Sequence, residues 1–550
     1  MKKFLAVLSL ITFVTVPFTA ATSSASPVIR VAPPAPKFSD AERQAELARR
    51  RNAVAAKMVD KSILILFSSE PKLYANDVDY VFRQENNLFY LTGLKQNGAM
   101  LVITKDGGAV KETLFIPKRI PIREAWEGKM YSREQATNIS GLNTIVDASE
   151  AVGFLTAVKA KSSFESKGSG AMIATDVAKL YLLLPNSESD RNGKREYRVE
   201  SEFAADALGR TIENARPIFD ELRHIKSPYE IKMLQHAIDI TTEAQMRSMG
   251  MVGNAKMEYE VHAEVEYTFR RRNADFWGYP SIVGCGANAT TLHYVESQGE
   301  VRKGDLLLMD VGAEYEHYTA DVTRTYPVNG KFTKEQAEIY RIVYDAQEAV
   351  AKATKPGVSF QTLQDIAKQT INDGLFKLGL VTDPKGSQVG YWFMHGLGHW
   401  LGMNVHDVGR YGVPLAPGMV FTNEPGIYIR EDALDNMKDT PENRAFIAKV
   451  RPVFEKYKNI GVRIEDDLLV TANGVEWMTK DLPRKLEDIE RFMASASKEM
   501  ASSPVRFQPT DLTLAMIGSM PTNGGTTARQ GFVRSGKNAA LNLSGHSHAE

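Results

Sequence analysis

Hydrophobic positions in the first part of the chain occur as short apolar runs. The runs SILILF, AMLVIT, ETLFIP and NTIVDA lie between residues 61 and 200 and alternate with helical and polar segments. Apolar runs of this length, bounded by polar residues, predict strands. We therefore expect a mixed α/β domain over residues 61–217, preceded over residues 26–60 by a Pro-rich spacer and a charged helix.

The hydrophobic pattern changes near residue 218. Ser227, Pro228 and Glu230 carry the marks of a capping box with proline in the first turn, and the helix they open is expected to end by Gly250. EYEVHAEVEYTFRRR predicts a second helix. The strand-like runs SIVGCG, GDLLLMDVG and ADVTRTYPV follow.

The same order of elements then recurs. Thr333 and Gln336 open a helix that is expected to end at Lys355-Pro356-Gly357. A further helix, FQTLQDIAKQTINDGLFKLG, precedes the strand-like runs MVFTNEPGIYI and GVRIEDDLLVT. Two helices and then strands, twice over, predict an α+β domain of two similar halves across residues 218–490, with helices covering a curved, largely antiparallel sheet.

The two ends of the chain differ from these domains. Residues 1–25 have the parts of a signal peptide: Lys2 and Lys3, then an apolar run, then small residues. The run is shorter than the roughly 20 residues that span a membrane, so we expect export to the periplasm or medium and no stable membrane anchor. Residues 491–550, rich in Ser, Gly, Ala and Asn, predict a disordered tail.

Composition narrows the classes of function. Lys plus Arg equals Asp plus Glu, 67 each, so no net field attracts nucleic acid, and we expect no nucleic-acid partner. Cys285 is the single cysteine. The chain therefore forms no internal disulfide, despite its expected oxidising destination.

Four acidic residues interrupt strongly apolar strand patterns. They are Asp310 in LLLMDVG, Asp321 in TADVTRTYPV, Glu424 in VFTNEPGIYI and Glu465 in VRIEDDLLV. Any one of them alone would be explained by a solvated edge position or a structural ion pair. Two in each proposed half favour a shared site, and because converging carboxylates repel one another, a cation must hold them ionised. Two divalent metal ions would do so.

The stretch HGLGHWLGMNVHDVG holds His395, His399 and His406. Their spacing suggests a helical zinc motif, but its glycines each cost about 1 kcal/mol inside a helix, and the four carboxylates leave room for one imidazole. Oxygen-rich ligation favours Mn²⁺, with Co²⁺ or Zn²⁺ possible. Two such ions share a hydroxide and stabilise the oxyanion that its attack creates, so hydrolysis of an acyl bond is the expected chemistry.

Several motifs carry a family resemblance in the family's order: LLLMDVGAEYEHYTADVTRTYPVNGKFT, HGLGHWLGMNVHDVG, NEPGIYI and GVRIEDDLLVT. With them, residues 218–482 resemble the pita-bread metallopeptidases and, among these, the Xaa-Pro aminopeptidases. YANDVDYVFRQENNLFYLTG, at 74–93, is similar to the N-terminal domain of those peptidases. The resemblance implies a pita-bread catalytic domain preceded by a smaller α/β domain.

The resemblance also implies a dinuclear metal centre. Asp321 and Glu465 would bridge the two ions, Asp310 would bind one ion, and His399 and Glu424 would bind the other. One departure from the family is the long segment REDALDNMKDTPENRAFIAKVRPVFEKYKN between the two glutamates. This segment leaves the shape of the cleft rim open.

Three further histidines are implied to lie at the substrate cleft. His293 matches the family's LHY motif, although a surface histidine is the alternative. A proline nitrogen carries no hydrogen and must gain a proton as it leaves, which suits imidazole. His293 and His406 are candidates for substrate binding, intermediate stabilisation and proton relay, while His395 is expected to shape the cleft and Glu424 to shuttle a proton.

Two more residues have candidate roles. Arg463 is a candidate to hold a ligand carboxylate in place, with an ordinary exposed arginine as the alternative. Trp126 resembles an aromatic residue that lines the cleft in oligomeric relatives, sometimes from a neighbouring subunit, with a core tryptophan as the alternative. The resemblance thus implies a homo-oligomer, dimer or tetramer.

The function implied is that of an exported, Mn²⁺-dependent aminopeptidase. It would release the N-terminal residue of peptides that have proline at the second position, by attack of a metal-bridging hydroxide. A prolidase, with the same chemistry limited to Xaa-Pro dipeptides, is the alternative enzyme. A non-catalytic binding protein on the same fold is the alternative from another class, but such proteins tend to lose ligands that this chain keeps.

Overall fold

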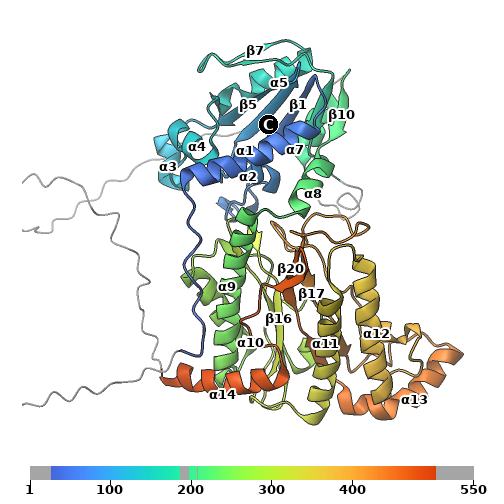
Figure 1. The fold of residues 1–550 in the computed structure, drawn as a ribbon. Helices are drawn as coiled ribbons and strands as arrows, with labels where there is room; N and C mark the ends of the chain where they lie inside the picture. The colour runs from blue at the N-terminus through green and yellow to red at the C-terminus, as the bar shows by residue number, and fades with distance from the viewer. Residues whose placement is uncertain (1–26, 186–196, 207–208, 503–550) are drawn as a thin grey trace, which may run out of the picture. The chain divides into compact units, whose positions relative to one another are not determined.

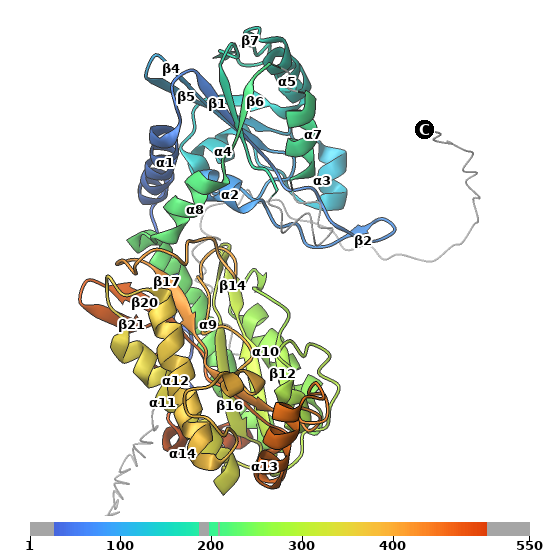
Figure 2. The same cartoon turned by 90° about the vertical axis from the view of Figure 1, so that its right-hand side faces the viewer.

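A computed structural model describes residues 27–185, 197–206 and 209–502, drawn from two sides in Figures 1 and 2. The expected signal peptide and the tail beyond Ser502 lie outside these residues. Within the described ranges, no helix combines the length and the apolar character that crossing a membrane requires.

The N-terminal domain is built on a six-stranded mixed sheet in the order β10-β9-β1-β4-β5-β6. β1 is antiparallel to β4 and parallel to β9. The strands are β1 Ser62–Phe67, β4 Met100–Asp106, β5 Ala109–Ile116, β6 Ile145–Asp147, β9 Lys179–Leu182 and β10 Thr211–Asn214. Outside the sheet are the hairpins β2 Leu73–Ala75 with β3 Val78–Asp79, and β7 Phe164–Glu165 with β8 Met172–Ile173.

Helices cover both faces of this sheet (Figure 2). One face packs against α1 Asp40–Lys57, α2 Asn86–Thr92, α4 Arg133–Ser140 and α8 Arg216–His224. The other face packs against α5 Ala151–Ala160 and α7 Arg198–Asp206. The short helices α3 Pro121–Glu127 and η1 Ala148–Glu150 complete the domain.

Two expected boundaries of the N-terminal domain differ from the structure. Val54 and Ala55 of α1 share a core with Leu64 and Leu66 of β1, so the charged helix belongs to this domain, which we expected to begin at 61. The expected boundary between 217 and 218 falls inside α8. Both differences have one cause, since apolar faces of connecting helices are buried by domains that a local pattern does not reveal.

The segment before α1 is fixed to the catalytic domain. The Val28 amide donates to Glu499 Oε2 at 2.6 Å, and the Ala32 amide donates to Glu243 Oε2 at 2.8 Å. Ser39 then caps α1 with a capping box. The Pro-rich stretch therefore runs along the catalytic domain before the chain enters the N-terminal domain.

The first half of the catalytic domain begins with the predicted capping box at Ser227. Its elements are α9 Pro228–Met251, η2 Val252–Asn254, α10 Glu258–Arg271, β11 Phe276–Trp277, β12 Ile282–Cys285, η3 Gly286–Thr290, β13 Leu306–Val311, β14 Ala313–Tyr315, β15 Tyr318–Thr319 and β16 Val322–Pro327. The strands form two antiparallel sheets, β12-β13-β16 and β11-β14-β15.

The second half repeats this order after a capping box at Thr333. Its elements are α11 Lys334–Ala353, α12 Phe360–Leu378, η4 Ser387–Tyr391, β17 Val420–Asn423, β18 Gly426–Ile429, α13 Pro441–Tyr457, β19 Ile460–Arg463, β20 Asp466–Thr471 and β21 Gly474–Trp477. β17-β20-β21 and β18-β19 are again antiparallel. Figure 1 shows the long helices of both halves standing along these strands.

The two halves are joined through their strands and share one hydrophobic core. The Glu465 amide donates to the Thr323 carbonyl at 3.1 Å, and the Thr325 hydroxyl donates to the Arg463 carbonyl at 2.9 Å. This direct link between β16 and the β19–β20 segment confirms the expected antiparallel α+β architecture of two similar halves.

The C-terminal helix corrects the expected start of the tail. α14 spans Leu486–Ser502, with Ile489, Phe492, Met493 and Ala496 buried in the shared core. The tail was expected from residue 491, inside this helix, because its Ser and Ala residues obscure a helical apolar stripe. Residues 503–550 lie outside the described part of the chain.

Cys285 lies at the end of β12 and is 5% exposed. Burial raises the pKa of its thiol to about 12. The thiol is therefore protonated and shielded in the folded protein.

Candidate metal centre

The five predicted ligands lie at the centre of the catalytic domain, on strands or strand ends of both halves. Asp310 lies in β13, Asp321 immediately before β16, Glu424 immediately after β17, Glu465 immediately before β20, and His399 in the segment that pairs with β17. Strands that meet from two halves therefore bring together residues up to 155 positions apart in the sequence.

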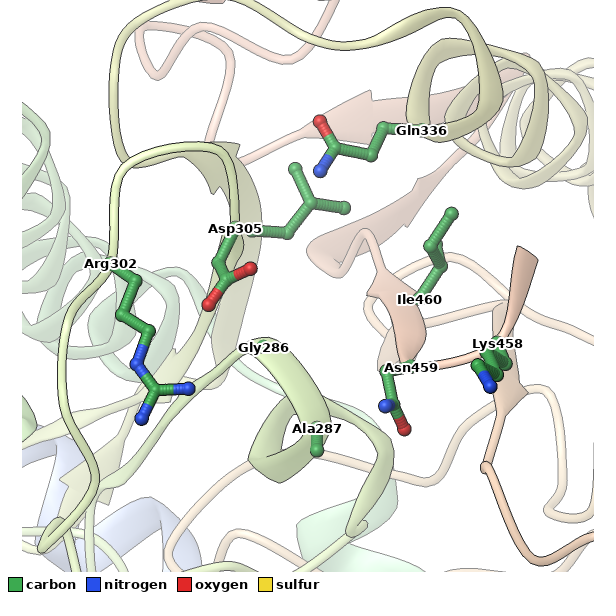
Figure 3. Close-up of a pocket in the computed structure, with 9 residues that line it drawn as sticks. Gly286, Ala287, Arg302, Asp305, Gln336, Lys458, Asn459 and Ile460 are labelled. Carbon is green, nitrogen blue, oxygen red and sulfur yellow. The ribbon is translucent and has the colours of Figure 1, made fainter. Parts of the chain in front are cut away.

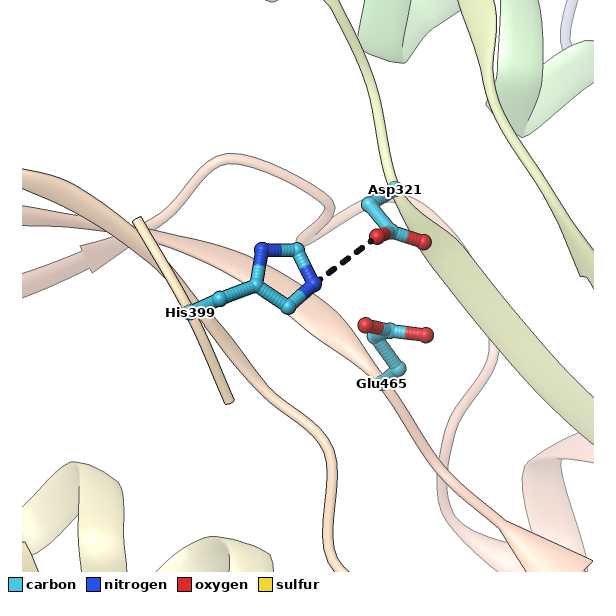
Figure 4. Close-up of side chains that lie close together, drawn as sticks. All are labelled: Asp321, His399 and Glu465. Carbon is cyan, nitrogen blue, oxygen red and sulfur yellow. Dashed lines mark ion pairs between the residues drawn. The ribbon is translucent and has the colours of Figure 1, made fainter. Parts of the chain in front are cut away.

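Asp321, His399 and Glu465 each offer a ligand atom within 4.8 Å of the others. Figure 4 shows the imidazole ring and both carboxylates turned toward one another. His399 Nε2 lies 3.3 Å from Asp321 Oδ2 and 3.4 Å from Glu424 Oε1. One imidazole thus touches a carboxylate from each half.

Asp310 joins this group through Tyr279. The Tyr279 hydroxyl lies 2.5 Å from Asp310 Oδ1 and 2.5 Å from Asp321 Oδ1. A hydroxyl has one proton to donate, so it satisfies one of these oxygens at a time. Two acidic side chains are therefore held closer together than their charges alone would allow.

Electrostatics separate Asp310 from the other acids. Burial opposes its ionisation, but the guanidinium of Arg463 and the hydroxyl of Tyr279 outweigh burial and lower the pKa of Asp310. Desolvation, followed by repulsion from Asp321, raises the pKa of Glu424 to about 7. Desolvation and the neighbouring acids also raise the pKa values of Asp321 and Glu465 well above their ordinary range.

This donor set fits divalent metal ions. Buried, mutually repelling carboxylates are stabilised in their ionised form by a nearby cation, and carboxylate oxygens with one imidazole suit hard or borderline divalent ions. Among the described residues, Arg463 is the one lysine or arginine whose side chain pairs with a ligand carboxylate. A single guanidinium leaves most of the negative charge uncompensated.

Arg463 is 3% exposed, so the alternative of an ordinary surface arginine is wrong. Its guanidinium donates to Asp310, to the Tyr428 hydroxyl at 2.8 Å and to Thr323 Oγ1 at 3.2 Å. Thr323 in turn donates to Glu465 Oε2 at 2.6 Å. The arginine of the second half therefore orients an acid of the first half.

The segment around His399 is irregular rather than helical, with one β-bridge from Trp400 to Phe421, and its glycines predicted the absence of a helix. The His399 amide donates to Thr422 Oγ1 at 3.0 Å, and the Thr422 amide donates to the His399 carbonyl at 2.9 Å. A Cβ atom on Gly398 would lie 2.0 Å from the Thr422 carbonyl oxygen. Gly398 therefore permits the close backbone approach that brings His399 to the acids.

His395 and His406 flank this ligand. His395 Nε2 lies 2.8 Å from the Tyr428 hydroxyl and its Nδ1 lies 3.9 Å from Glu424 Oε2. Burial, with Arg463 nearby, lowers the pKa of His395 to about 4. The His406 ring lies 4.0 Å from the His399 ring, between centroids.

His293 is solvent-exposed. It lies close enough to His395 and His406 to contribute to the lowering of both pKa values. The pKa of His406 is lowered by desolvation, by His399 and by His293. The structure therefore brings all three predicted cleft histidines close to one another.

The loop that carries His406 is anchored from outside the catalytic domain. Arg83 Nη2 donates to the Met403 carbonyl at 2.8 Å, and Arg223 of α8 forms a buried ion pair with Asp407. Sequence motifs marked the loop but not these anchors. The N-terminal domain therefore contributes to the position of a cleft histidine.

Trp126 lies on α3 and is 85% exposed, so the alternative of a core tryptophan is wrong. Ile122 on the same helix is 71% exposed. The hairpin β2–β3 also exposes Tyr74 and Val78. The N-terminal domain thus presents large apolar side chains to solvent, which is typical of an interaction surface.

The long segment between Glu424 and Glu465 forms α13, which supports the cleft wall. Phe454 lies 6.0 Å from Trp392 between ring centroids. The Trp392 carbonyl accepts from the Tyr428 amide at 2.9 Å, and the Tyr428 hydroxyl contacts His395. The insertion therefore acts behind the histidine rather than on the metal ligands.

Sequence reasoning missed the hydroxyl groups that orient the ligands. Tyr279, Thr323, Thr422 and Tyr428 contact ligands or Arg463. Tyrosine and threonine fit ordinary strand patterns, so periodicity gives no signal for them. The alternation of Thr323 and Thr325 along a buried strand was the one available hint.

A separate cavity of about 250 Å³ lies at the first residues of β13 and β19, the ends of these strands that are farther from the predicted ligands (Figure 3). It is lined by Gly286, Ala287, Arg302, Asp305, Leu306, Gln336, Lys458, Asn459 and Ile460. Leu306 begins β13 and Ile460 begins β19, so the cavity lies between the two halves. None of the predicted site residues lines it.

Four carboxylates and one imidazole, converging from two similar antiparallel halves, define a metal-dependent hydrolase site. The profile of metallopeptidase family M24 matches residues 232–472, and that of the aminopeptidase P N-terminal domain matches residues 47–165. The chain belongs to metallopeptidase family M24.

Relatives and solved structures agree with this assignment. The Xaa-Pro aminopeptidase of Haemophilus influenzae is 37% identical over 82% of this chain and 97% of its own length. That of Escherichia coli is 35% identical over 84% of this chain and 100% of its own length. A structure of an Escherichia coli aminopeptidase P variant in complex with substrate superposes with a TM-score of 0.71 at 32% identity, over 84% of this chain and 100% of that chain. These similarities confirm the pita-bread fold with its N-terminal domain and the metallopeptidase class.

Proposed function

We propose that this protein hydrolyses the bond between an N-terminal residue and a following proline, using two divalent metal ions, with Mn²⁺ as the proposed metal. The observation that carries the proposal is the convergence of Asp310, Asp321, His399, Glu424 and Glu465 in one buried cluster. The names of its relatives, Xaa-Pro aminopeptidases, support the substrate class.

The five residues divide between the two ions. Asp321 and Glu465, one from each half, would hold both ions, Asp310 would hold one of them, and His399 and Glu424 would hold the other. When bound, the ions would activate water and stabilise negative charge on the amide oxygen. Tyr279, Thr323 and Arg463 hold the ligand oxygens in place through the hydrogen bonds described above.

The remaining groups manage protons. Glu424, whose Oε1 lies 3.4 Å from His399 Nε2, would accept a proton from the attacking water at a carboxylate oxygen. The proline nitrogen needs a proton to leave, and the exposed imidazoles of His293 and His406 are the candidates for this proton relay and for binding the substrate and its intermediate. His395, held by Tyr428, shapes the wall behind the scissile bond.

The proposal includes assembly and location. Exposed Trp126 and its apolar neighbours support a dimer or tetramer in which this surface meets another copy. The signal-like N-terminus supports export, with cleavage among the small residues at 21–25. Light scattering, cell fractionation and N-terminal sequencing test these two points.

The decisive experiment removes metal with a chelator and adds Mn²⁺ back. Hydrolysis of an Xaa-Pro-Xaa tripeptide, restored by Mn²⁺, is the expected result. Cleavage of Xaa-Pro dipeptides alone would identify a prolidase instead. Absence of metal binding and of activity after Mn²⁺ addition would leave the non-catalytic binding protein.

A further inference from the structure

A glutamine on α9 reaches the strands that carry the first two acids. Gln245 is 0% exposed. Its Nε2 donates to the Met309 carbonyl at 3.1 Å and to the Val322 carbonyl at 2.8 Å. Met309 precedes Asp310 and Val322 follows Asp321 in the sequence.

A glutamine on α11 does the same in the second half. Gln347 is also 0% exposed. Its Nε2 lies 3.0 Å from the Asn423 carbonyl oxygen, 3.0 Å from the Ile464 carbonyl oxygen and 2.8 Å from Asp466 Oδ2, so its two N–H groups are shared among three acceptors. Asn423 precedes Glu424 and Ile464 precedes Glu465. Two buried amides therefore bond the backbone next to all four acidic ligands.

Burying an amide has a cost that an apolar side chain would not have. Gln245 Oε1 has no hydrogen-bond partner among the described residues, and an unsatisfied buried acceptor costs roughly 1–3 kcal/mol. Ile240, Ala244 and Met249 on the same helix show that apolar residues fill this core. The two N–H groups, rather than the bulk of the side chain, explain the presence of glutamine.

We infer that Gln245 and Gln347 are positioning residues of the metal centre, which fix the separation of the two acid-bearing strands in each half. The inference rests on the proposed dinuclear site. Backbone that holds a ligand in place conditions metal affinity as an orienting side chain does, and loss of such partners typically costs about 10–100-fold in affinity.

The two glutamines are not expected to contribute equally to the position of the metal ligands. In the first half, β13 and β16 are paired directly, with Asp310 opposite Thr323 and Val311 opposite Val322. In the second half, Ile464 lies between β19 and β20, outside the paired residues of either strand. The Ile464 amide reaches the Pro425 carbonyl at 3.4 Å, so Gln347 supports a position held by one long backbone contact, and its loss is expected to have the larger effect.

Methionine substitutions test the inference, because methionine keeps the length of glutamine without its donors. Gln245→Met, Gln347→Met and the matched control Gln235→Met are compared with the wild type as metal-free proteins. Gln235 lies on α9 and donates to the Met478 carbonyl at 3.0 Å, away from the ligands. The readouts are the Kd of Mn²⁺ alone, measured against a competing chelator, and the thermal stability of the metal-free protein.

We expect the Mn²⁺ Kd to rise about tenfold for Gln245→Met and more for Gln347→Met, and to stay within about twofold for Gln235→Met. Unchanged Mn²⁺ affinity in both test variants, with a loss of stability like that of the control, would overturn the positioning role. If Gln347→Met does not fold, Gln347→Asn, which keeps a shorter amide, replaces it under the same criterion. A wild-type protein that binds no Mn²⁺ would overturn the proposed function itself, which is a distinct outcome.

Discussion

The two halves of the catalytic domain share one hairpin architecture but differ in their ligand residues and in the tips of their hairpins. Each half is a bent hairpin, β13–β14 with β15–β16 in the first and β17–β18 with β19–β20 in the second. In both halves, acids lie where the hairpin bends or near that bend. The first half uses short aspartates and the second uses longer glutamates.

The halves differ most at the tip of the hairpin. In the first half Glu316 and His317 form a tight turn with φ of 49° and 67°, and His317 stacks on Phe89 of the N-terminal domain at 4.0 Å. In the second half residues 430–459, including α13, occupy the tip. The ligand end is thus conserved between the halves while each tip is adapted to a different neighbour.

The strongest test of the equivalence removes, from each half, the acid that is proposed to bridge the two ions. Asp321→Asn and Glu465→Gln are each expected to lower kcat/KM at least about 1,000-fold, since metal-ion charge stabilisation supplies several kcal/mol and 1.36 kcal/mol is tenfold. Steady-state kinetics with Mn²⁺ measure the loss, and circular dichroism confirms folding. Near-normal activity in one variant alone would show that the halves do not share the bridging role.

The link between the halves is tested at Arg463. Arg463→Lys keeps the charge but loses the planar fork that reaches Asp310, Tyr428 and Thr323. We expect kcat/KM to fall about 10–100-fold.

The control for this variant is Arg51→Lys, a buried arginine of the N-terminal domain that donates to the Leu91 and Ser140 carbonyls. The control is expected to lose thermal stability but little activity. If Arg463→Lys and Arg51→Lys retained equal activity, Arg463 would have no role in orienting the ligands.

Two ligand acids, Glu424 of the second half and Asp310 of the first, are expected to respond oppositely to pH when metal is absent. The folded pKa of Glu424 is raised from 4.5 to about 7, so its stabilisation of the fold is present at low pH and is lost as pH rises through 7. The loss is roughly 3 kcal/mol at most, from 1.36 kcal/mol per pKa unit. The folded pKa of Asp310 is lowered, so Asp310 stabilises the fold above its ordinary pKa of 3.8 and this is lost as pH falls.

Thermal melts in a chelator at pH 5.5 and pH 8 measure this contrast. At pH 8, Glu424→Gln is expected to melt above the wild type and Asp310→Asn below it. The reverse order would contradict the assignment of Arg463 as the partner of Asp310. Added Mn²⁺ is expected to restore wild-type stability at pH 8 by binding the folded state.

The smallest expected effect tests the hairpin tips. Phe454→Ala removes the contact between α13 and Trp392, and we expect KM for tripeptides to rise about threefold with kcat nearly unchanged, as for a loss of uniform binding. His317→Asn, at the other tip, keeps a residue that tolerates positive φ and is expected to leave KM unchanged. Equal KM shifts in the two variants would contradict the separate roles of the tips.

The sequence predicted the architecture because capping boxes and apolar strand runs are local signals. Ser227 and Thr333 open α9 and α11 as expected, and the acids stood out because charge in an apolar strand is costly. Three features depend on tertiary contacts instead. These are the hydrogen bonds of Tyr279 to the aspartates, those of Gln245 and Gln347 to backbone carbonyls, and the anchoring of the His406 loop. Such contacts leave no period in the sequence, so these features could not be predicted.

The single thiol, at Cys285, offers a way to measure how often the folded protein opens. The thiol is buried beside the strand that carries Asp310 and is held in its unreactive protonated form, so a thiol reagent modifies it only when that strand opens. The labelling rate therefore counts openings of the first half without any mutation, with one signal per chain. Bound metal is expected to slow labelling. The ratio of the labelling rates with and without metal would therefore measure how much metal stabilises the first half against opening.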